Sequence, residues 1–155
     1  MLNLFESHQF SFDHEDSYEV FRRVARAIPL DNSFGGKYAC TSKYRLRSRD
    51  DPRFTDRRMQ ALLANIMQNL HKMNVSQLSH IFYSTVKLRL PEDELLNEVI
   101  ERLTESFEST EKADRMSLKD LSIVIWAAAR IKLPKNSELS RHLKISAQNA
   151  ILDCI

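Results

Sequence analysis

The sequence predicts an all-α protein, organised as a short α-solenoid of helix hairpins that repeat about every 43 residues. Three observations lead to this fold class. The chain has only two glycines in 155 residues, which excludes glycine-rich phosphate loops and leaves few residues for the tight turns of a β-sandwich. Apolar residues recur at helical spacing along several segments. One 19-residue segment also occurs twice, as a repeat of helical hairpins requires.

The N-terminal part is expected to be an arm followed by a first helix. Residues 1–15 carry three phenylalanines without helical spacing, which predicts an extended arm that docks on another surface. Asp16 and Glu19 have the spacing of a capping box, and Pro29 directly follows Ile28. These signals predict a helix over 17–28.

A long basic loop is expected next. Residues 30–53 contain both glycines, and loops of this length without secondary structure commonly have a function. Residues 21–72 carry twelve lysines and arginines against four aspartates. We therefore divide the chain into an arm (1–15), a first helix with the basic loop (16–54) and a helical-repeat domain (55–155), which opens with a helix predicted over 55–72.

The repeat relates residues 73–91 to residues 116–134. Five of the nineteen aligned pairs are identical, and each copy opens on a polar cap and closes on Leu-Pro. The pattern predicts first helices over 75–88 and 118–131, packed side by side, and second helices over 92–107 and 137–150. The positions expected to be buried between the layers are Leu78, Ile81, Phe82, Val86, Leu121, Val124, Ile125 and Ala129.

The second copy resembles the octotricopeptide and heptatricopeptide repeats of organellar proteins. Residues 116–132 read MSLKDLSIVIWAAARIK, which is similar to the Leu-Ser, Trp-Ala and final basic pattern of those first helices and of the related RAP and FAST-kinase-like proteins. Tyr83 replaces the tryptophan in the first copy. The resemblance covers about a quarter of the chain, and it implies a mitochondrion (its matrix) or a plastid, with a role in RNA processing, translation or the organellar ribosome.

RNA-phosphate contacts are the expected chemistry of the basic residues. Arginines alternate along the loop, with Tyr38 and Tyr44 between the charges, and the 43-residue offset aligns two basic pairs near the Leu-Pro corners. The opposing interpretation pairs the loop arginines with the acidic stretch 91–115. The candidate RNA-binding residues are Lys43, Arg45, Arg47, Arg49, Arg53, Arg57, Arg58, Lys87, Arg89, Arg130 and Lys132.

Other site chemistry finds little support in the residue pattern. Cys40 and Cys154 are far apart, and the five histidines lack the spacing of metal ligands on one helix. No apolar run is long enough to cross a bilayer. We therefore expect no cofactor, no catalysis and no membrane insertion. The predicted function is a non-catalytic subunit of an organellar ribonucleoprotein, foremost a mitochondrial ribosome, that contacts rRNA and neighbouring proteins. The alternatives are a scaffold subunit of a mitochondrial respiratory or ATP synthase complex and a trans-acting RNA-processing factor.

Overall fold

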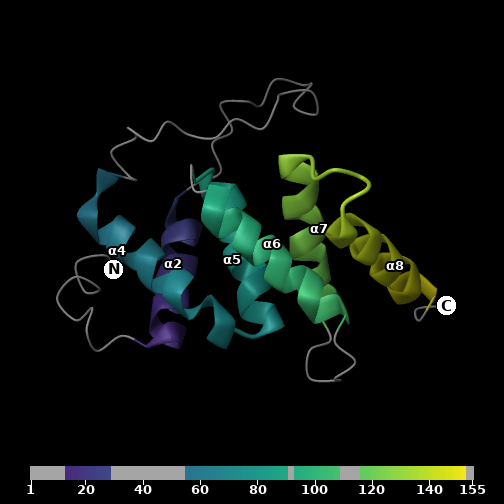
Figure 1. Ribbon diagram of the computed structural model, residues 1–155, viewed down its shortest axis with the longest axis horizontal. Coiled ribbons are helices and arrows are strands. Elements are labelled where there is room, and N and C mark those ends of the chain that lie inside the picture. The colour runs from purple at the N-terminus through teal and green to yellow at the C-terminus, as the bar shows by residue number, and fades with distance from the viewer. Residues whose placement is uncertain (1–12, 29–54, 91–92, 109–115, 153–155) are drawn as a thin grey trace.

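The computed structural model describes residues 13–28, 55–90, 93–108 and 116–152, and this part of the chain is helical without a strand (Figure 1). The prediction of an all-α protein is confirmed for it. Residues 1–12 of the expected arm and the basic loop 30–53 lie outside the described residues. The elements are α2 (His14–Ala27), α4 (Arg57–Asn69), the 3₁₀ turn η2 (Leu70–Lys72), α5 (Val75–Leu88), α6 (Asp93–Glu108), α7 (Leu118–Ile131) and α8 (Glu138–Leu152).

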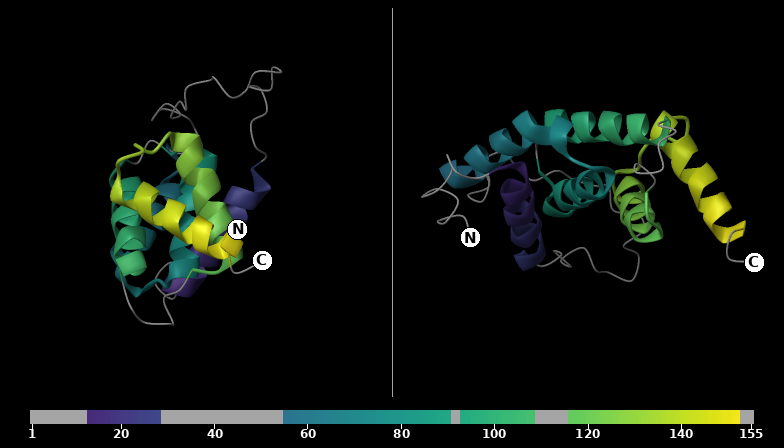
Figure 2. Two further views of the ribbon diagram at one scale, coloured as in Figure 1. Left: turned by 90° about the vertical axis from the view of Figure 1, so that its right-hand side faces the viewer. Right: turned by 90° about the horizontal axis from the view of Figure 1, so that it is seen from below.

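The helices form two layers. Figure 2, in its right-hand view, shows α2, α5 and α7 side by side in one layer and α4 and α6 in the other, with α8 at the end of the row. One contiguous hydrophobic core fills the space between the layers. Its largest fully buried side chains are Phe21, Met59, Leu62, Ile66, Leu70, Ile81, Phe82, Leu88, Leu90, Leu103 and Leu139.

Helix α2 begins three residues earlier than the sequence predicts. The capping box joins Asp13 and Asp16: the Asp13 carboxylate accepts from the Asp16 N–H at 2.9 Å, and the Asp16 carboxylate accepts from the Asp13 N–H at 3.4 Å. Residues 14 and 15 therefore belong to the helix and not to an arm. Ser17 is buried in this helix, and its hydroxyl donates to Asn65 Oδ1 at 2.8 Å across to α4. Glu19 lies inside the helix.

Helix α4 begins after Asp56, whose carboxylate accepts from the Arg58 N–H at 2.9 Å. The last turn of the segment tightens into η2, so that the predicted span 55–72 is helical in two parts. Helix α6 covers 93–108 and α8 covers 138–152, each shifted by one or two residues from its predicted bounds.

Helices α5 and α7 agree with the prediction residue for residue. Both start after a polar cap, Asn74 or Ser117, and both end in a left-handed residue, Arg89 (φ 56°) or Lys132 (φ 55°). In each copy the following leucine N–H donates back to the helix, Leu90 to Thr85 O at 3.2 Å and Leu133 to Ala128 O at 3.0 Å. These contacts form the same Schellman motif 43 residues apart.

The burial prediction is wrong at two positions of α7. Ile125 is 38% exposed, and Ala129 is also exposed, whereas the other six predicted positions are buried. The cause is the position of the helix. Helix α5 lies between α2 and α7, whereas only α8, at the end of the row, lies beyond α7 (Figure 1), and a groove lined by Ile125 and Ala129 stays open between α7 and α8. Trp126 is half-buried and packs against the core.

Candidate nucleic-acid interface

A basic groove of about 280 Å³ lies where α2, α5 and α7 meet. We call it the basic groove throughout. Five of its side chains are basic or, in the case of histidine, can become so, and they come from all three helices of one layer. The lining residues are Arg22, Ala25, Arg26, His80, Tyr83, Ser84, Lys87, Lys119 and Ile123.

Helical spacing places these side chains on one surface. Arg22 and Arg26 are four residues apart on α2, so they project from the same side of that helix. On α5, His80, Ser84 and Lys87 follow at intervals of four and three residues. Gln77 has the same helical spacing, three residues before His80. In the structure the Gln77 side chain instead accepts from the Asn74 N–H at 3.0 Å and completes the capping box of α5.

Positive charge accumulates in the basic groove, and three of its cations have no carboxylate partner among the described residues. Arg22 pairs with Glu19 on its own helix at 2.7 Å. Within the described part of the chain, the side chains of Arg26, Lys87 and Lys119 form no ion pair with a carboxylate. Burial lowers the pKa of Lys87 below its ordinary value of 10.5, and the positive charge of Arg26 lowers it further. An anion in the groove would offset this repulsion.

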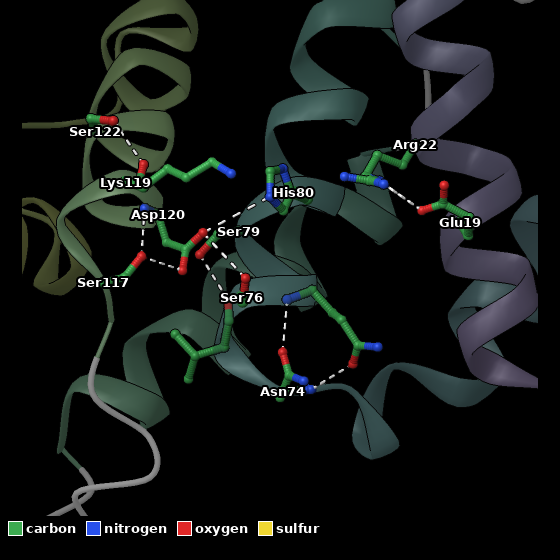
Figure 3. A network of polar contacts seen from close by, with 12 residues as sticks. Glu19, Arg22, Asn74, Ser76, Ser79, His80, Ser117, Lys119, Asp120 and Ser122 are labelled. Atoms are coloured by element: carbon green, nitrogen blue, oxygen red, sulfur yellow. Dashed lines mark hydrogen bonds and ion pairs between the residues drawn. The ribbon is translucent and has the colours of Figure 1, made fainter.

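A polar network includes His80 and Lys119 of the basic groove (Figure 3). The buried Asp120 carboxylate accepts from the Ser117 hydroxyl at 2.7 Å and from the Ser76 hydroxyl at 3.2 Å, which joins α7 to α5. The Nε2 atom of His80 lies 3.9 Å from Asp120 Oδ1. Burial lowers the pKa of His80 below 6.5 despite the opposing effect of this carboxylate. The imidazole is therefore neutral at pH 7 and forms no charged pair with Asp120.

The hydroxyls of the network do not form a nucleophile–base arrangement with His80. Ser76 and Ser117 donate to Asp120, and Ser79 donates to the backbone oxygen of Val75 at 2.8 Å. Within the described residues, none of the three hydroxyls is hydrogen-bonded to the His80 ring, a contact that a histidine-activated serine requires. The contacts that the network does make join two neighbouring helices.

Two aromatic rings, one from α5 and one from α7, contact each other beside the basic groove. Tyr83 lines the basic groove, and its ring centroid lies 5.0 Å from that of Trp126. The Arg130 guanidinium lies over the Trp126 ring, 5.7 Å from its centroid. Arg130 is thus held by a cation–π contact next to the groove while its charge stays exposed.

The predicted RNA-binding residues do not form one site in the described structure. Lys87 lines the basic groove, whereas Lys132 lines a separate groove between α7 and α8. Arg89 is half-buried at the end of α5. Arg57 is exposed at the start of α4. Five predicted loop residues lie outside the described residues: Lys43, Arg45, Arg47, Arg49 and Arg53.

Arg58, another predicted RNA-binding residue, has a structural partner. Its guanidinium is 2.6 Å from the Asp56 carboxylate, and this contact, together with the Arg58 N–H, lowers the pKa of Asp56 to about 2. The charge of Arg58 therefore supports the start of α4.

Sequence analysis missed Arg22, Arg26 and Lys119 as site residues. The i, i+4 spacing of the two arginines was a readable signal for one basic helix surface. Nothing in the linear sequence places that surface beside Lys87 and Lys119, because the three helices are brought together only by packing on the shared core.

Neither a metal site nor a known relative gives further information on the role of the basic groove. The described residues contain no group of three or more histidine, cysteine, aspartate or glutamate side chains arranged to hold a metal ion. Among the same residues, no helix combines the length and apolar character that crossing a bilayer requires. Comparisons with protein-family models, curated proteins and solved structures found no match for the chain.

Proposed function

We propose that the protein is a non-catalytic helical-repeat module that binds the phosphate backbone of RNA through the basic groove. The observation that carries this proposal is the convergence of Arg26, Lys87 and Lys119 on one cavity without a partner carboxylate in the described structure. Phosphates are the anions that such a cluster suits, because each contact releases a condensed counterion from the nucleic acid.

The repeat architecture supports this proposal. Helices α5 and α7 have equivalent bounds, equivalent caps and equivalent Schellman motifs at an offset of 43 residues. We interpret the hairpins α5–α6 and α7–α8 as two units of an α-solenoid, and α2 with α4 as a degenerate first unit. In this interpretation the basic groove runs along the layer of first helices, the layer that lines the binding surface of RNA-binding solenoids.

The lining of the basic groove favours binding that is independent of RNA sequence. It contains no asparagine or glutamine that could pair with a base edge, and Ile123 and Ala25 contribute apolar surface. Tyr83 adds an aromatic ring to the lining, and a base of any kind can stack on such a ring.

The test is the salt dependence of binding to a fluorescein-labelled single-stranded RNA oligonucleotide, measured with the full chain. The triple variant Arg26→Gln/Lys87→Gln/Lys119→Gln should reduce the slope of log affinity against log salt by about two, at roughly 0.7 per lost phosphate contact. The matched control, Lys72→Gln/Lys135→Gln/Arg141→Gln, removes the same charge from exposed positions outside the groove. An equal loss in both variants, or no loss in the first, would refute a specific site in the basic groove.

The same experiment also tests the arginines of the basic loop. If the basic loop also contacts phosphates, Arg45→Ala/Arg47→Ala/Arg49→Ala should lower the slope by about two on its own. Charge reversal of Glu94 and Glu98 on α6 should leave the slope unchanged. If the triple alanine variant keeps its RNA affinity and its slope but loses its place in the assembly, these arginines contact protein carboxylates and not RNA.

The resemblance to organellar repeats extends the proposal to a mitochondrial ribonucleoprotein, foremost the mitochondrial ribosome. Sedimentation of the native protein from purified mitochondria tests this step. Co-migration with ribosomal RNA that is lost on RNase treatment supports it. RNase-resistant migration with an inner-membrane complex would instead favour a scaffold role.

A further inference from the structure

The outer side of α7 carries an apolar stripe that its counterpart α5 buries. At an offset of 43 residues, the α5 positions Val75, Phe82 and Val86 are 8%, 0% and 1% exposed. The equivalent positions of α7 are Leu118, at 61%, Ile125, at 38%, and the exposed Ala129. On α5 this stripe borders Ser76 and Tyr83, the residues that contact Asp120 and Trp126 of α7. On α5 the stripe therefore lies next to the surface that α7 contacts.

A groove of about 320 Å³ runs beside this stripe between α7 and α8, and we call it the α7–α8 groove. Most of its lining is apolar, and several of its residues are alanines, which allow a helix backbone to approach closely. The lining residues are Ile125, Ala128, Ala129, Lys132, Leu133, Ser140, Leu143, Lys144 and Ala147. Ile145 and Leu152 add exposed apolar surface farther along α8.

Two lysines give the α7–α8 groove a definite charge. Lys132 and Lys144 line it from opposite helices, and both are exposed. Within the described part of the chain, neither forms an ion pair with a carboxylate. An apolar surface between two free cations is complementary to a helix that has an apolar stripe and acidic residues beside it.

We propose that the α7–α8 groove binds an amphipathic α-helix of a partner protein, with acidic residues beside its apolar stripe, packed against α7 as α7 packs against α5. The internal repeat specifies a helix as the occupant, and Lys132 and Lys144 specify its charge. This proposal does not depend on RNA binding, because the basic groove uses other residues.

A second copy of the chain suits this surface less well. Twofold pairing through the α7–α8 groove would bring the lysines of both copies together. A head-to-tail contact would need another apolar surface. Within the described residues, however, all the large exposed apolar side chains lie on α7 and α8: Leu118, Ile125, Ile145 and Leu152.

Two synthetic peptides with the same apolar stripe test the proposal. The parent peptide has the sequence of residues 117–133, and the acidic peptide carries glutamate in place of Lys119, Arg130 and Lys132. Binding of each labelled peptide to the full chain is measured by fluorescence anisotropy. We expect the acidic peptide to bind about tenfold tighter than the parent peptide, or better, and to gain helical circular dichroism when it binds.

Variants of the protein locate the binding. Ile125→Asp should weaken the acidic peptide at least about tenfold, whereas Ala64→Asp, at an exposed position of α4, should not. Lys132→Glu/Lys144→Glu changes only exposed side chains and should reverse the preference between the two peptides. Because both lysines are exposed, this double variant tests the groove even if Ile125→Asp impairs folding.

Several results would overturn the proposal. One is equal affinity for the two peptides, and another is no binding of either peptide. A third is binding that stays the same in both the Ile125→Asp variant and the double lysine variant. Concentration-dependent self-association in analytical ultracentrifugation, lost in Ile125→Asp, would identify a second copy as the occupant and also refute the proposal. The RNA salt slope of Ile125→Asp should equal that of the unmodified chain, so that failure here is separable from failure of the proposed RNA function.

Discussion

Helices α5 and α7 are two copies of one structural unit in different surroundings. They share their length, their polar N-caps and their left-handed C-terminal residues. Helix α5 lies between α2 and α7 and is buried at nine of its fourteen positions. Helix α7 lies between α5 and α8, leaves an open groove towards α8 and is buried at five. The comparison shows that the local pattern determines the helix, while the exposure of a given position depends on which helices pack around it.

The two sides of α7 also differ in charge and in the partner they suit. Its inner side contributes Lys119 and Ile123 to the basic groove, where cations dominate. Its outer side contributes Ile125, Ala128 and Ala129 to a mainly apolar surface. The proposed ligand of the first surface is therefore RNA phosphate, and the proposed partner of the second is a helix.

The largest expected effect is a difference in the loss of stability when equivalent side chains of α5 and α7 are truncated. Phe82→Ala should lower the free energy of unfolding by about 3–5 kcal/mol, because the ring is fully buried between α5 and its neighbours. Ile125→Ala, at the equivalent position, should cost about 1 kcal/mol or less, since this side chain is partly in solvent. Urea denaturation monitored by circular dichroism measures both. Similar costs would show that the outer side of α7 is covered in solution.

The next effect concerns the helix N-termini. Asp120 accepts hydrogen bonds from both helices, so Asp120→Ala should cost about 1–3 kcal/mol by leaving the Ser76 and Ser117 hydroxyls without their acceptor. Gln77, its counterpart, only completes a local capping box, and Gln77→Ala should cost about 0.5 kcal/mol. The same denaturation assay compares them. If the two losses are equal, Asp120 does not join α7 to α5 in solution.

A smaller effect concerns the left-handed residues that end the two helices. Lys132→Gly should raise the free energy of unfolding by about 0.5 kcal/mol, because glycine adopts a positive φ without the steric cost of a Cβ atom. Arg89→Gly should gain less, since it also removes a half-buried side chain that interacts with its surroundings. Thermal melting of the two variants ranks them. Destabilisation by Lys132→Gly would contradict the Schellman geometry at the end of α7.

The smallest expected effect is a pH dependence of stability that arises from His80 of α5. Helix α7 has no counterpart, because Ile123 occupies the equivalent position. Burial lowers the pKa of His80 below 6.5, and the facing groups are Tyr18, Arg22 and Arg26 of α2 and Lys119 and Asp120 of α7. The unfolded chain thus binds this proton more readily, and stability should fall as the pH drops from about 7 through 6.5.

The His80→Gln variant should show a flatter dependence of stability on pH over that interval. His71→Gln, at an exposed position, should keep the original dependence. Denaturation midpoints measured at several pH values decide the outcome. A profile of His80→Gln identical to that of the unmodified chain would mean that His80 titrates normally.

Local signals in the sequence were sufficient for the helices themselves. The bounds of α5 and α7 followed from a polar cap, apolar periodicity and a Leu-Pro end, because capping hydrogen bonds and turn geometry involve residues only a few positions apart. The start of α2 shows the limit of such signals. Asp13 with Asp16 and Asp16 with Glu19 have the same spacing, so spacing alone could not show that the first pair forms the capping box.

The candidate surfaces depended on tertiary structure. The repeat revealed that α5 and α7 are equivalent, but it could not show that Ile125 would be exposed where Phe82 is buried. Nor could it bring Arg26 of α2 beside Lys87 and Lys119. The sequence by itself determined the helices and their pairing, because periodicity and capping act within one segment. Only the packing of three separate helices on one core decided which cations share a groove and which apolar stripe lacks a neighbour, since burial depends on the residues that lie around a position in space.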